Sequence, residues 1–128
     1  MVNLMPEKYI ALIAHDGKKP NMVSLIMKNL NLFKNHKIVA TGTTGGLIKS
    51  EGLEVQLLES GPKGGDAQIA TMAVENKLKC VIFLVDPLEV HPHQVDVSML
   101  LRICNVHNVP LATNVATAEL LIKELNDN

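Results

Sequence analysis

The sequence has very few aromatic side chains: two phenylalanines, one tyrosine and no tryptophan among 128 residues. Apolar residues nevertheless make up 47% of the chain, so its core must be built from aliphatic side chains. A chain of this length can bury a substantial core within one domain. We therefore expect residues 1–128 to form a single domain.

The sequence also lacks an excess of charge and any long apolar run. Twelve basic and thirteen acidic residues leave a net charge of −1, with no basic stripe and no interleaved aromatics. This balance excludes a broad nucleic-acid-binding surface. No segment approaches the ~20 apolar residues that span a bilayer, and the N-terminus does not have the pattern of a secretory signal. We expect a cytoplasmic protein that binds neither nucleic acid nor membranes.

Cysteine is scarce as well. Cys80 and Cys104 are far apart in the sequence, and both fall within apolar patterns. That placement is typical of two reduced, buried thiols rather than of a disulfide.

The sequence does contain a regular alternation of apolar runs and amphipathic segments. We expect strands at residues 9–14, 37–41, 54–58, 80–85 and 109–112. Mostly apolar residues at helical spacing follow each strand: Val23, Ile26, Met27, Leu30 and Phe33; Leu47 and Ile48; Ile69, Met72 and Ala73, with Asn76 on the same face; Val97, Leu100, Leu101 and Cys104; and Ala118, Leu121, Ile122 and Leu125. Five strand–helix units predict a three-layer α/β/α fold, Rossmann-like or flavodoxin-like, with a five-stranded parallel sheet.

Polar residues are concentrated directly after the expected strands. Open parallel sheets bind ligands outside the carboxyl ends of their strands. The clusters are His15-Asp16, residues 41–46, 60–66 and 86–96, and Thr113-Asn114. We therefore expect a functional site at this edge of the sheet.

The segment Thr41-Gly42-Thr43-Thr44-Gly45 offers hydroxyl groups and flexible backbone N–H groups. That combination suits one phosphate group. The spacing of a P-loop and that of a dinucleotide-binding fingerprint are both absent. The alternative is an ordinary glycine-rich turn with threonine caps.

The segment Ser60-Gly61-Pro62-Lys63-Gly64-Gly65-Asp66 places a carboxylate at a glycine-rich turn just before a helical pattern. Glycines allow the backbone to approach a ligand closely, and a helix start offers unpaired N–H groups to an anion. Asp66 could then act as a base beside a bound phosphate. Alternatively, it is only the N-cap of the helix.

Histidines provide the remaining candidates. His15-Asp16, with Lys19 nearby, could add a cation to the anion site or merely end a strand. His91 and His93 near Asp96 could bind zinc, although no third ligand at a defined spacing is evident. A neutral imidazole that acts as an electrophile or proton carrier is the favoured interpretation. His36 and His107 lack polar company and are interpreted as surface or cap residues.

Taken together, these segments resemble methylglyoxal synthase along essentially the whole chain. Several motifs in the same order carry the resemblance. They are Ile13-Ala14-His15-Asp16, Ala40-Thr41-Gly42-Thr43-Thr44-Gly45, Ser60-Gly61-Pro62-Lys63-Gly64-Gly65-Asp66-Ala67-Gln68, Asp86-Pro87, Pro92-His93 with Asp96, and Ala112-Thr113-Asn114-Val115-Ala116-Thr117.

The resemblance implies a carbon–oxygen lyase that converts dihydroxyacetone phosphate to methylglyoxal and inorganic phosphate, without a metal or organic cofactor. It implies that Asp66 is the base and that His93 polarises the carbonyl and carries a proton. Asp16 and Asp96 match further catalytic residues, and Asp86 matches a supporting one. The residues that match the substrate- and phosphate-binding set are His15, Lys19, Thr41, Thr43, Thr44, Ser60 and Gly61. The resemblance further implies inhibition by inorganic phosphate and assembly as a homohexamer.

One departure concerns the C-terminus. The family usually carries a basic residue in a tail beyond the last helix, whereas this sequence ends Asn126-Asp127-Asn128 with no arginine after Arg102. We expect that phosphate contact to be absent or supplied by another group.

Two other functions remain open at this point. Similar domains in larger biosynthetic enzymes are regulatory modules that bind small phosphorylated or charged metabolites. An isomerase would use the same enediol intermediate with a different bond geometry.

Overall fold

The computed structural model describes residues 7–88 and 97–126. His91, His93 and Asp96 therefore lie outside the described residues, and so does the sequence prediction that a helix begins at Asp96.

The described residues form a five-stranded parallel sheet. Its strands are β1 (Tyr9–Ala14), β2 (Lys37–Ala40), β3 (Gln56–Leu57), β4 (Leu78–Leu84) and β5 (Leu111–Ala112). The strand order is β3-β2-β1-β4-β5, and each neighbouring pair is parallel. The predicted α/β class and five-stranded parallel sheet are confirmed.

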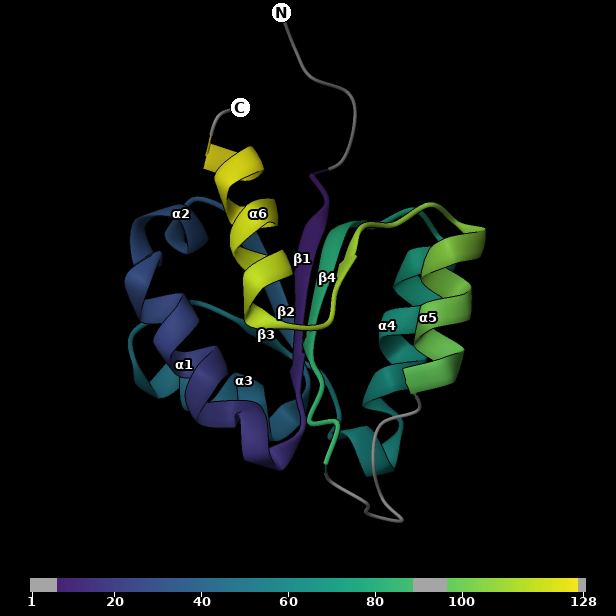
Figure 1. Cartoon of the computed structure of the whole chain (residues 1–128), viewed down its shortest axis with the longest axis horizontal. Helices are drawn as coiled ribbons and strands as arrows, with labels where there is room; N and C mark the ends of the chain where they lie inside the picture. The colour runs from purple at the N-terminus through teal and green to yellow at the C-terminus, as the bar shows by residue number, and fades with distance from the viewer. Residues whose placement is uncertain (1–6, 89–96, 127–128) are drawn as a thin grey trace, which may run out of the picture.

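Helices cover both faces of the sheet. They are α1 (Lys19–Lys28), α2 (Leu30–Lys34), α3 (Gly42–Ser50), α4 (Gly65–Val74), α5 (Val97–Val106) and α6 (Val115–Asn126), with short 3₁₀ helices η1 (Asp16–Lys18) and η2 (Gly61–Lys63). Helices α4 and α5 lie on one face, and α1, α2, α3 and α6 lie on the other (Figure 1). The three predicted layers are therefore present.

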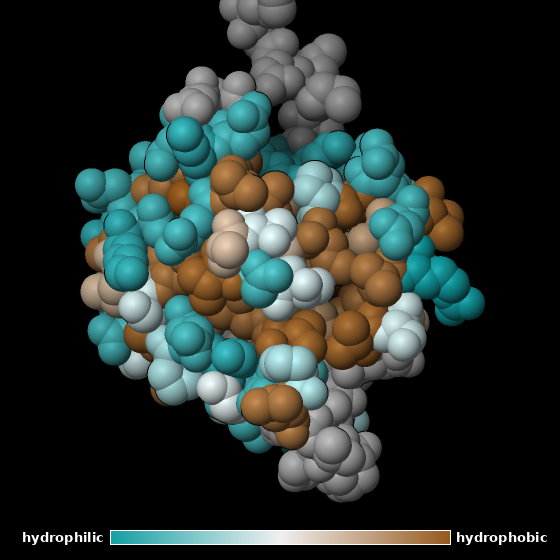
Figure 2. Space-filling model, in the orientation of Figure 1, coloured by the Kyte–Doolittle hydropathy of each residue, from teal (hydrophilic) through white to brown (hydrophobic). Residues whose placement is uncertain are grey.

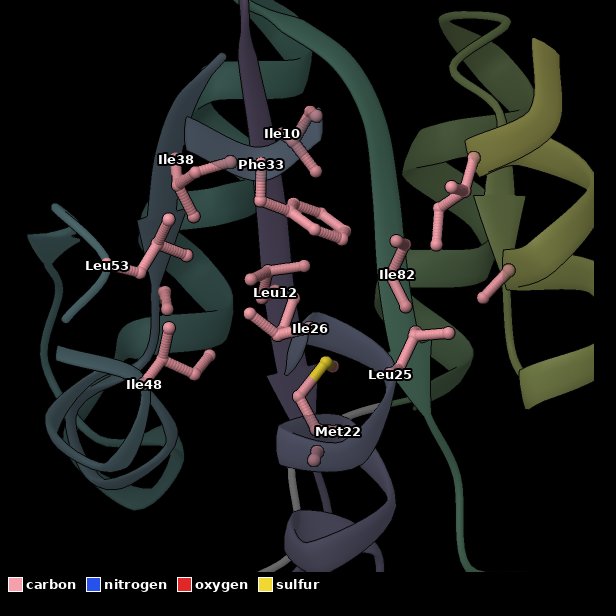
Figure 3. Close-up of a cluster of buried hydrophobic side chains, with 14 of the residues drawn as sticks. Ile10, Leu12, Met22, Leu25, Ile26, Phe33, Ile38, Ile48, Leu53 and Ile82 are labelled. Carbon is pink, nitrogen blue, oxygen red and sulfur yellow. The ribbon is translucent and has the colours of Figure 1, made fainter. Parts of the chain in front are cut away.

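The larger core cluster fills the space under α1, α2, α3 and α6. Alternate residues of the central strands, such as Ile10 and Leu12 of β1, point into it and are fully buried. Figure 3 shows Phe33 of α2 and Met22 and Ile26 of α1 packed over that strand. The intervening residues of the same strands face α4 and α5, where they form the second cluster. A strand buried on both faces needs a continuous apolar run, which explains the composition of β1 and β4.

Several boundaries differ from the sequence predictions. The first predicted helix is interrupted at Asn29, which separates α1 from α2. Strand β3 pairs over two residues only, not over 54–58. Helix α4 ends at Val74, and Asn76 has a left-handed backbone (φ 61°) beyond it rather than a place on the helix face. Leu101 of α5 is 47% exposed, whereas Leu100 and Cys104 are buried as expected.

The glycine-rich segment after β2 is also not the loop that was predicted. Helix α3 begins at Gly42, so Thr43, Thr44 and Gly45 form its first turns. Glycine is usually a poor helix former, but here its small size is required. A β-carbon on Gly45 would lie 2.4 Å from the Leu57 side chain of β3.

Both cysteines are free and buried, as the sequence predicts. Burial raises the pKa of the Cys80 thiol to about 11 and raises that of Cys104 as well. Within the described residues, no helix is both long and apolar enough to cross a membrane.

Candidate active site

The carboxyl ends of β1 and β4 lie next to each other in the sheet. From β1 the chain winds outward through β2 to β3, then crosses to β4 on the other side of β1 and continues to β5. The winding direction therefore reverses between β1 and β4. Such switch points open a crevice at the carboxyl edge where ligands bind in α/β proteins. His15 and Asp16 follow β1, and Asp86 follows β4, so all three residues come to this point.

His15 is held by backbone atoms of both strands. Its N–H donates to the Leu84 carbonyl (3.1 Å), and its ring Nδ1 accepts a hydrogen bond from the Asp86 backbone N–H (2.9 Å). The ring also packs edge-on against Phe83. Because Nδ1 accepts, the ring proton must lie on Nε2. That Nε2–H group is buried and has no hydrogen-bond partner among the described residues.

Gly17 brings the loop after β1 against the carboxylate of Asp86. A β-carbon at Gly17 would lie only 2.4 Å from Asp86 Oδ2. The other oxygen, Oδ1, accepts the backbone N–H of Leu88 (3.0 Å). The loop after β4 thus holds Oδ1 of Asp86, and the missing side chain at Gly17 leaves room for Oδ2.

Lys19 and Asp16 form an ion pair within this loop. The Lys19 side chain is 17% exposed, whereas that of Asp16 is 78% exposed. Lys19 is the first residue of α1, and its stem is packed while its charge stays at the carboxyl edge. The predicted cation is therefore present beside His15 and Asp16.

The start of α3 contributes hydroxyl groups to the same edge. Thr41 and Thr44 are buried, whereas Thr43 is exposed. The Thr44 hydroxyl has no hydrogen-bond partner among the described residues. A buried polar atom without a partner costs about 1–3 kcal/mol, so such atoms are rare except where something else is to be bound. Thr44 and His15 share this unusual state.

The start of α4 packs directly on the loop after β3 and on the start of α3. Gly42 N–H donates to the Glu59 carbonyl (3.2 Å), and Gly65 N–H donates to the Ser60 carbonyl (3.0 Å). A β-carbon at Gly65 would lie 2.1 Å from the Glu59 carbonyl oxygen and 2.9 Å from Thr41 Cγ2. Two helix N-termini and the half-buried Ser60 are thereby brought together.

Asp66 is the second residue of α4 and not its N-cap, because Gly64, with a left-handed backbone (φ 105°), precedes the helix. Its Oδ1 atom accepts the N–H of Ala67 (2.8 Å). The carboxylate therefore lies in the first helical turn, half-buried, among the N–H groups that favour negative charge there. This position is compatible with a base and also stabilises the helix start.

Gln68 was given no role in the sequence analysis. Its Oε1 atom accepts the backbone N–H of Glu59 (2.8 Å), and so ties α4 to the loop that presents Ser60. Gly17 likewise had no predicted role, and Gly65 was expected to allow a ligand to approach rather than to make room for the Glu59 carbonyl. Sequence alone does not show which residues meet across the sheet edge. The one sequence signal for Gln68 was its place at the end of the motif that runs from Ser60 to Gln68.

The structure thus brings most of the predicted site residues to the carboxyl edge of four neighbouring strands. His15, Asp16, Lys19 and Asp86 form one group, and Thr41, Thr43, Thr44, Ser60, Gly61 and Asp66 form the other. His93 and Asp96 lie outside the described residues. Among the residues that are described, no group of three or more histidine, cysteine or acidic side chains is placed to hold a metal ion. The zinc alternative at His91 and His93 also falls outside that range.

Comparison with known proteins gives a consistent result. Residues 21–113 match the MGS-like domain family. The chain is 49% identical to a methylglyoxal synthase of Moorella thermoacetica over 120 residues, which cover 93% of this chain and 94% of the relative. It is 50% identical to a methylglyoxal synthase of Bacillus subtilis over 119 residues, covering 92% and 87%.

Solved structures agree with the sequence relatives. The crystal structure of methylglyoxal synthase from Elizabethkingia anophelis superimposes with a TM-score of 0.87 at 43% identity, covering 91% of this chain and 77% of that one. The structure of ForH, at 20% identity and a TM-score of 0.60, shares the fold alone. The chain matches the family domain over most of its length, and it is about 50% identical to methylglyoxal synthases over more than 90% of its residues. The chain therefore belongs to the methylglyoxal synthase family and is a lyase.

Proposed function

We propose that the chain converts dihydroxyacetone phosphate to methylglyoxal and inorganic phosphate through an enediolate, with the carboxyl edge of the sheet as its active site. The observation that carries the reaction is the identity of about one half to methylglyoxal synthases over more than 90% of the chain. Two buried donors that have no partner within residues 7–88 and 97–126, His15 Nε2 and Thr44 Oγ1, support the location, because an oxygen-rich ligand would satisfy both.

The phosphate would be held where α3 and α4 begin. First-turn N–H groups of a helix have no intrahelical partners and favour an anion. The Thr44 hydroxyl and Ser60 lie at this point, and the Lys19 ammonium adds a full charge from the neighbouring loop. Thr41, Thr43 and Gly61 complete the proposed cradle. Because one cradle fits both anions, inorganic phosphate should inhibit the enzyme.

Asp66 would remove a proton from the hydroxymethyl carbon next to the carbonyl. The electron pair of that C–H bond forms the C=C bond of the enediolate, and the carbonyl oxygen becomes an oxyanion. A neutral donor aimed at that oxygen contributes about 3–4 kcal/mol in comparable enzymes. We assign this role to His93, with Asp96 orienting its ring, and we place Asp16 and Asp86 as supporting carboxylates.

Phosphate then leaves with the electrons of its carbon–oxygen bond. At the same time the C=C electron pair shifts toward the carbon that loses phosphate, and the terminal hydroxyl becomes the aldehyde as its proton passes through His93 to the central oxygen. The resulting enol aldehyde takes up a proton on its methylene carbon, loses the proton of its enol hydroxyl and becomes methylglyoxal. This cleavage requires the carbon–oxygen bond to stand perpendicular to the enediolate plane, where its orbital overlaps the π system. A bond in the plane would instead favour isomerisation. The cradle would therefore decide the product as well as the affinity.

The experiment is an assay of the purified chain with dihydroxyacetone phosphate as the sole addition, with methylglyoxal and phosphate measured together. We expect equal amounts of both products, and the same rate in the presence of a chelator. Isomerised substrate without phosphate release would replace the lyase proposal by the isomerase. Activity that a chelator abolishes and zinc restores would assign a metal to His91 and His93.

We also propose that residues 1–128 act as one domain, that the protein is cytoplasmic and that it assembles as a homohexamer. Figure 2 shows hydrophobic surface across the middle of one face, bordered by hydrophilic side chains. Partly exposed large apolar side chains of this kind support self-association. Exposed large apolar side chains occur on helices of both sheet faces, and among the described residues they are Met27, Leu47, Leu57, Val74, Leu88, Leu101, Val106 and Leu120. Light scattering tests the assembly, and a monomeric mass at micromolar concentration with full activity would rule it out.

A further inference from the structure

A second pocket lies at the opposite edge of the sheet, where β1 and β2 begin. Its volume is about 540 Å³, within the ~300–1,000 Å³ typical of small-molecule sites. Buried apolar residues such as Phe33 form its base, and Tyr9, Lys34, His36 and Lys37 lie around it. We call it the amino-edge pocket. It shares no residue with the carboxyl-edge site.

Cations dominate the walls of the amino-edge pocket. Lys34 is the last residue of α2 and Lys37 the first of β2, and both are exposed. The Lys37 ammonium lies 5.6 Å from the centroid of the Tyr9 ring, a distance at which the ring attracts the charge. Among the described residues, neither lysine forms an ion pair with a carboxylate. Glu54 is an acidic residue in the lining and reduces the positive charge only in part.

A third cation lies behind the pocket wall. The Lys79 ammonium, from β4, lies 2.9 Å from Nδ1 of His36. An ammonium group can only donate, so Nδ1 accepts and the imidazole is neutral. The positive charge of Lys79 is therefore half-buried against an uncharged partner, and the second ring nitrogen of His36 remains as an N–H donor. Uncompensated charge in such a position is costly, and an incoming anion would lower that cost.

We propose that the amino-edge pocket binds a small organic polyanion, a molecule with two or more carboxylate or phosphate groups. Its negative groups would lie among Lys34, Lys37 and the His36–Lys79 pair. Two lysines in the lining, with Lys79 behind His36, can meet more than one negative group of a ligand. The proposal is independent of the reaction at the carboxyl edge, because different residues carry it.

Binding of this kind has a defined pH dependence. Burial and the neighbouring Lys79 lower the pKa of His36, while Glu7 raises it. An anion beside the imidazole favours its protonated form and must raise this pKa, so binding takes up protons and becomes tighter as the pH falls. Lys34, Lys37 and Lys79 act in the same direction as the histidine in attracting the ligand, whereas Glu7 and Glu54 oppose it.

Calorimetric titration of the whole chain with citrate and, separately, with pyrophosphate tests the proposal. We expect at least one of them to bind, with an affinity that falls as salt is added. Lys37→Gln and Lys79→Gln should each weaken binding about fivefold or more, as expected for loss of a charge-assisted contact. Glutamine at position 79 can still donate to His36, so this variant removes the charge and keeps the hydrogen bond. Lys123→Gln, on the exposed side of α6, is the matched control and should bind as the wild type does.

A carboxyl-edge variant separates the two sites. Thr44→Val removes a hydroxyl from the proposed phosphate cradle and should leave citrate binding unchanged. The His36 proton resonance in an NMR titration should move in the wild type as citrate is added. Binding by citrate alone would define the ligand as a carboxylate, and binding by pyrophosphate alone, weakened in the lysine variants and kept in Thr44→Val, would define it as a phosphate ester. Three results would overturn the proposal: binding by neither anion, an equal loss in Lys123→Gln, or a loss in Thr44→Val with none in the lysine variants.

Discussion

The two edges of the same sheet differ in the polar groups that they offer to an anion. At the carboxyl edge, short neutral donors such as His15 Nε2 and the Thr44 hydroxyl are buried, oriented by backbone contacts and without a partner among the described residues. At the amino edge, lysines on flexible stems provide full charges around an open pocket. Fixed dipoles orient a reacting group, whereas mobile ammonium groups attract an anion without fixing its geometry. We therefore expect the reaction to take place at the carboxyl edge, and the amino edge to bind an anion without reacting with it.

The largest expected effect is at Asp66. Asp66→Asn keeps an oxygen that can accept the Ala67 N–H but removes the proposed base. Activity should fall by about 10²–10⁴-fold, the usual contribution of a general base, while the melting temperature changes little. Steady-state kinetics and thermal denaturation measure the two effects. Near-normal turnover would leave Asp66 with a purely structural role in the helix start.

A pair of glycine variants tests how tightly the carboxyl edge is packed. Gly65→Ala forces a β-carbon to within 2.1 Å of the Glu59 carbonyl oxygen, so the free energy of unfolding should fall by about 1–3 kcal/mol or more. At Gly46, which also lies in a helix, an added β-carbon would have no atom within 4 Å. Gly46→Ala should therefore stabilise the fold by about 0.4–1 kcal/mol. Denaturant unfolding of both variants decides the matter. Equal changes would mean that α4 can shift away from its neighbours.

The next variant separates stability from binding. Thr44→Val replaces a buried hydroxyl that has no partner among the described residues, so unfolding should cost about 1 kcal/mol more. The Michaelis constant should nevertheless rise about tenfold, as for loss of a hydrogen bond to a charged group. Thr43→Val, at an exposed position, is the control for stability and should leave the melting temperature unchanged. If Thr44→Val lowers both stability and affinity, the hydroxyl has a structural partner.

A smaller effect is expected at Gln68, which we regard as a positioning residue. Gln68→Leu removes the acceptor of the Glu59 N–H and should lower kcat/KM by a few fold, mainly through the Michaelis constant. Gln68→Glu keeps an acceptor oxygen and should restore most of the loss. Equal behaviour of the two variants would show that the hydrogen bond does not position the loop before Ser60.

The smallest effect concerns the amino edge. The pKa of His36 is lowered below its ordinary value of 6.5 by burial and by Lys79. The unfolded chain therefore binds more protons near that pH, and the stabilising contribution of the neutral imidazole is lost as the pH falls through 6.5 and below. Lys79→Met should raise the His36 pKa and reduce this loss. An NMR titration of His36 in both proteins measures it, and an unchanged pKa would remove Lys79 as a cause.

The sequence predicts secondary structure best for strands that are buried on both faces. Strand β1 spans residues 9–14 as predicted, because a strand covered on both faces must be apolar throughout. It predicts less well at the edge, where β3 pairs over two residues and needs little side-chain burial. It fails for residues 42–45, where glycine propensity suggests a loop; the close approach of Leu57 accounts for the glycine at position 45 but is not visible in the sequence.

The candidate site shows the same limit. Residue types after each strand indicated where His15, Lys19 and Asp66 would gather, because parallel strands end at one edge. The partners of these residues are not local in sequence. Asp86 reaches His15 from 71 residues away, and Lys79 reaches His36 from 43 residues away. The prediction that His36 has no polar company was therefore wrong, since Lys79 contacts its ring, whereas its half-buried place at the surface agrees with the prediction.

The two buried thiols have a further consequence for a protein that makes a reactive dicarbonyl. Thiolates, lysine amines and the neutral guanidine form of arginine attack such electrophiles. Because burial raises the pKa of the Cys80 thiol to about 11, this thiol stays protonated near neutral pH. Cys104 is also buried with a raised pKa, and Arg102 is the sole arginine of the sequence. The folded chain thus withholds both thiols from its own product, and mass spectrometry after prolonged turnover should find adducts at lysines or Arg102 before either cysteine.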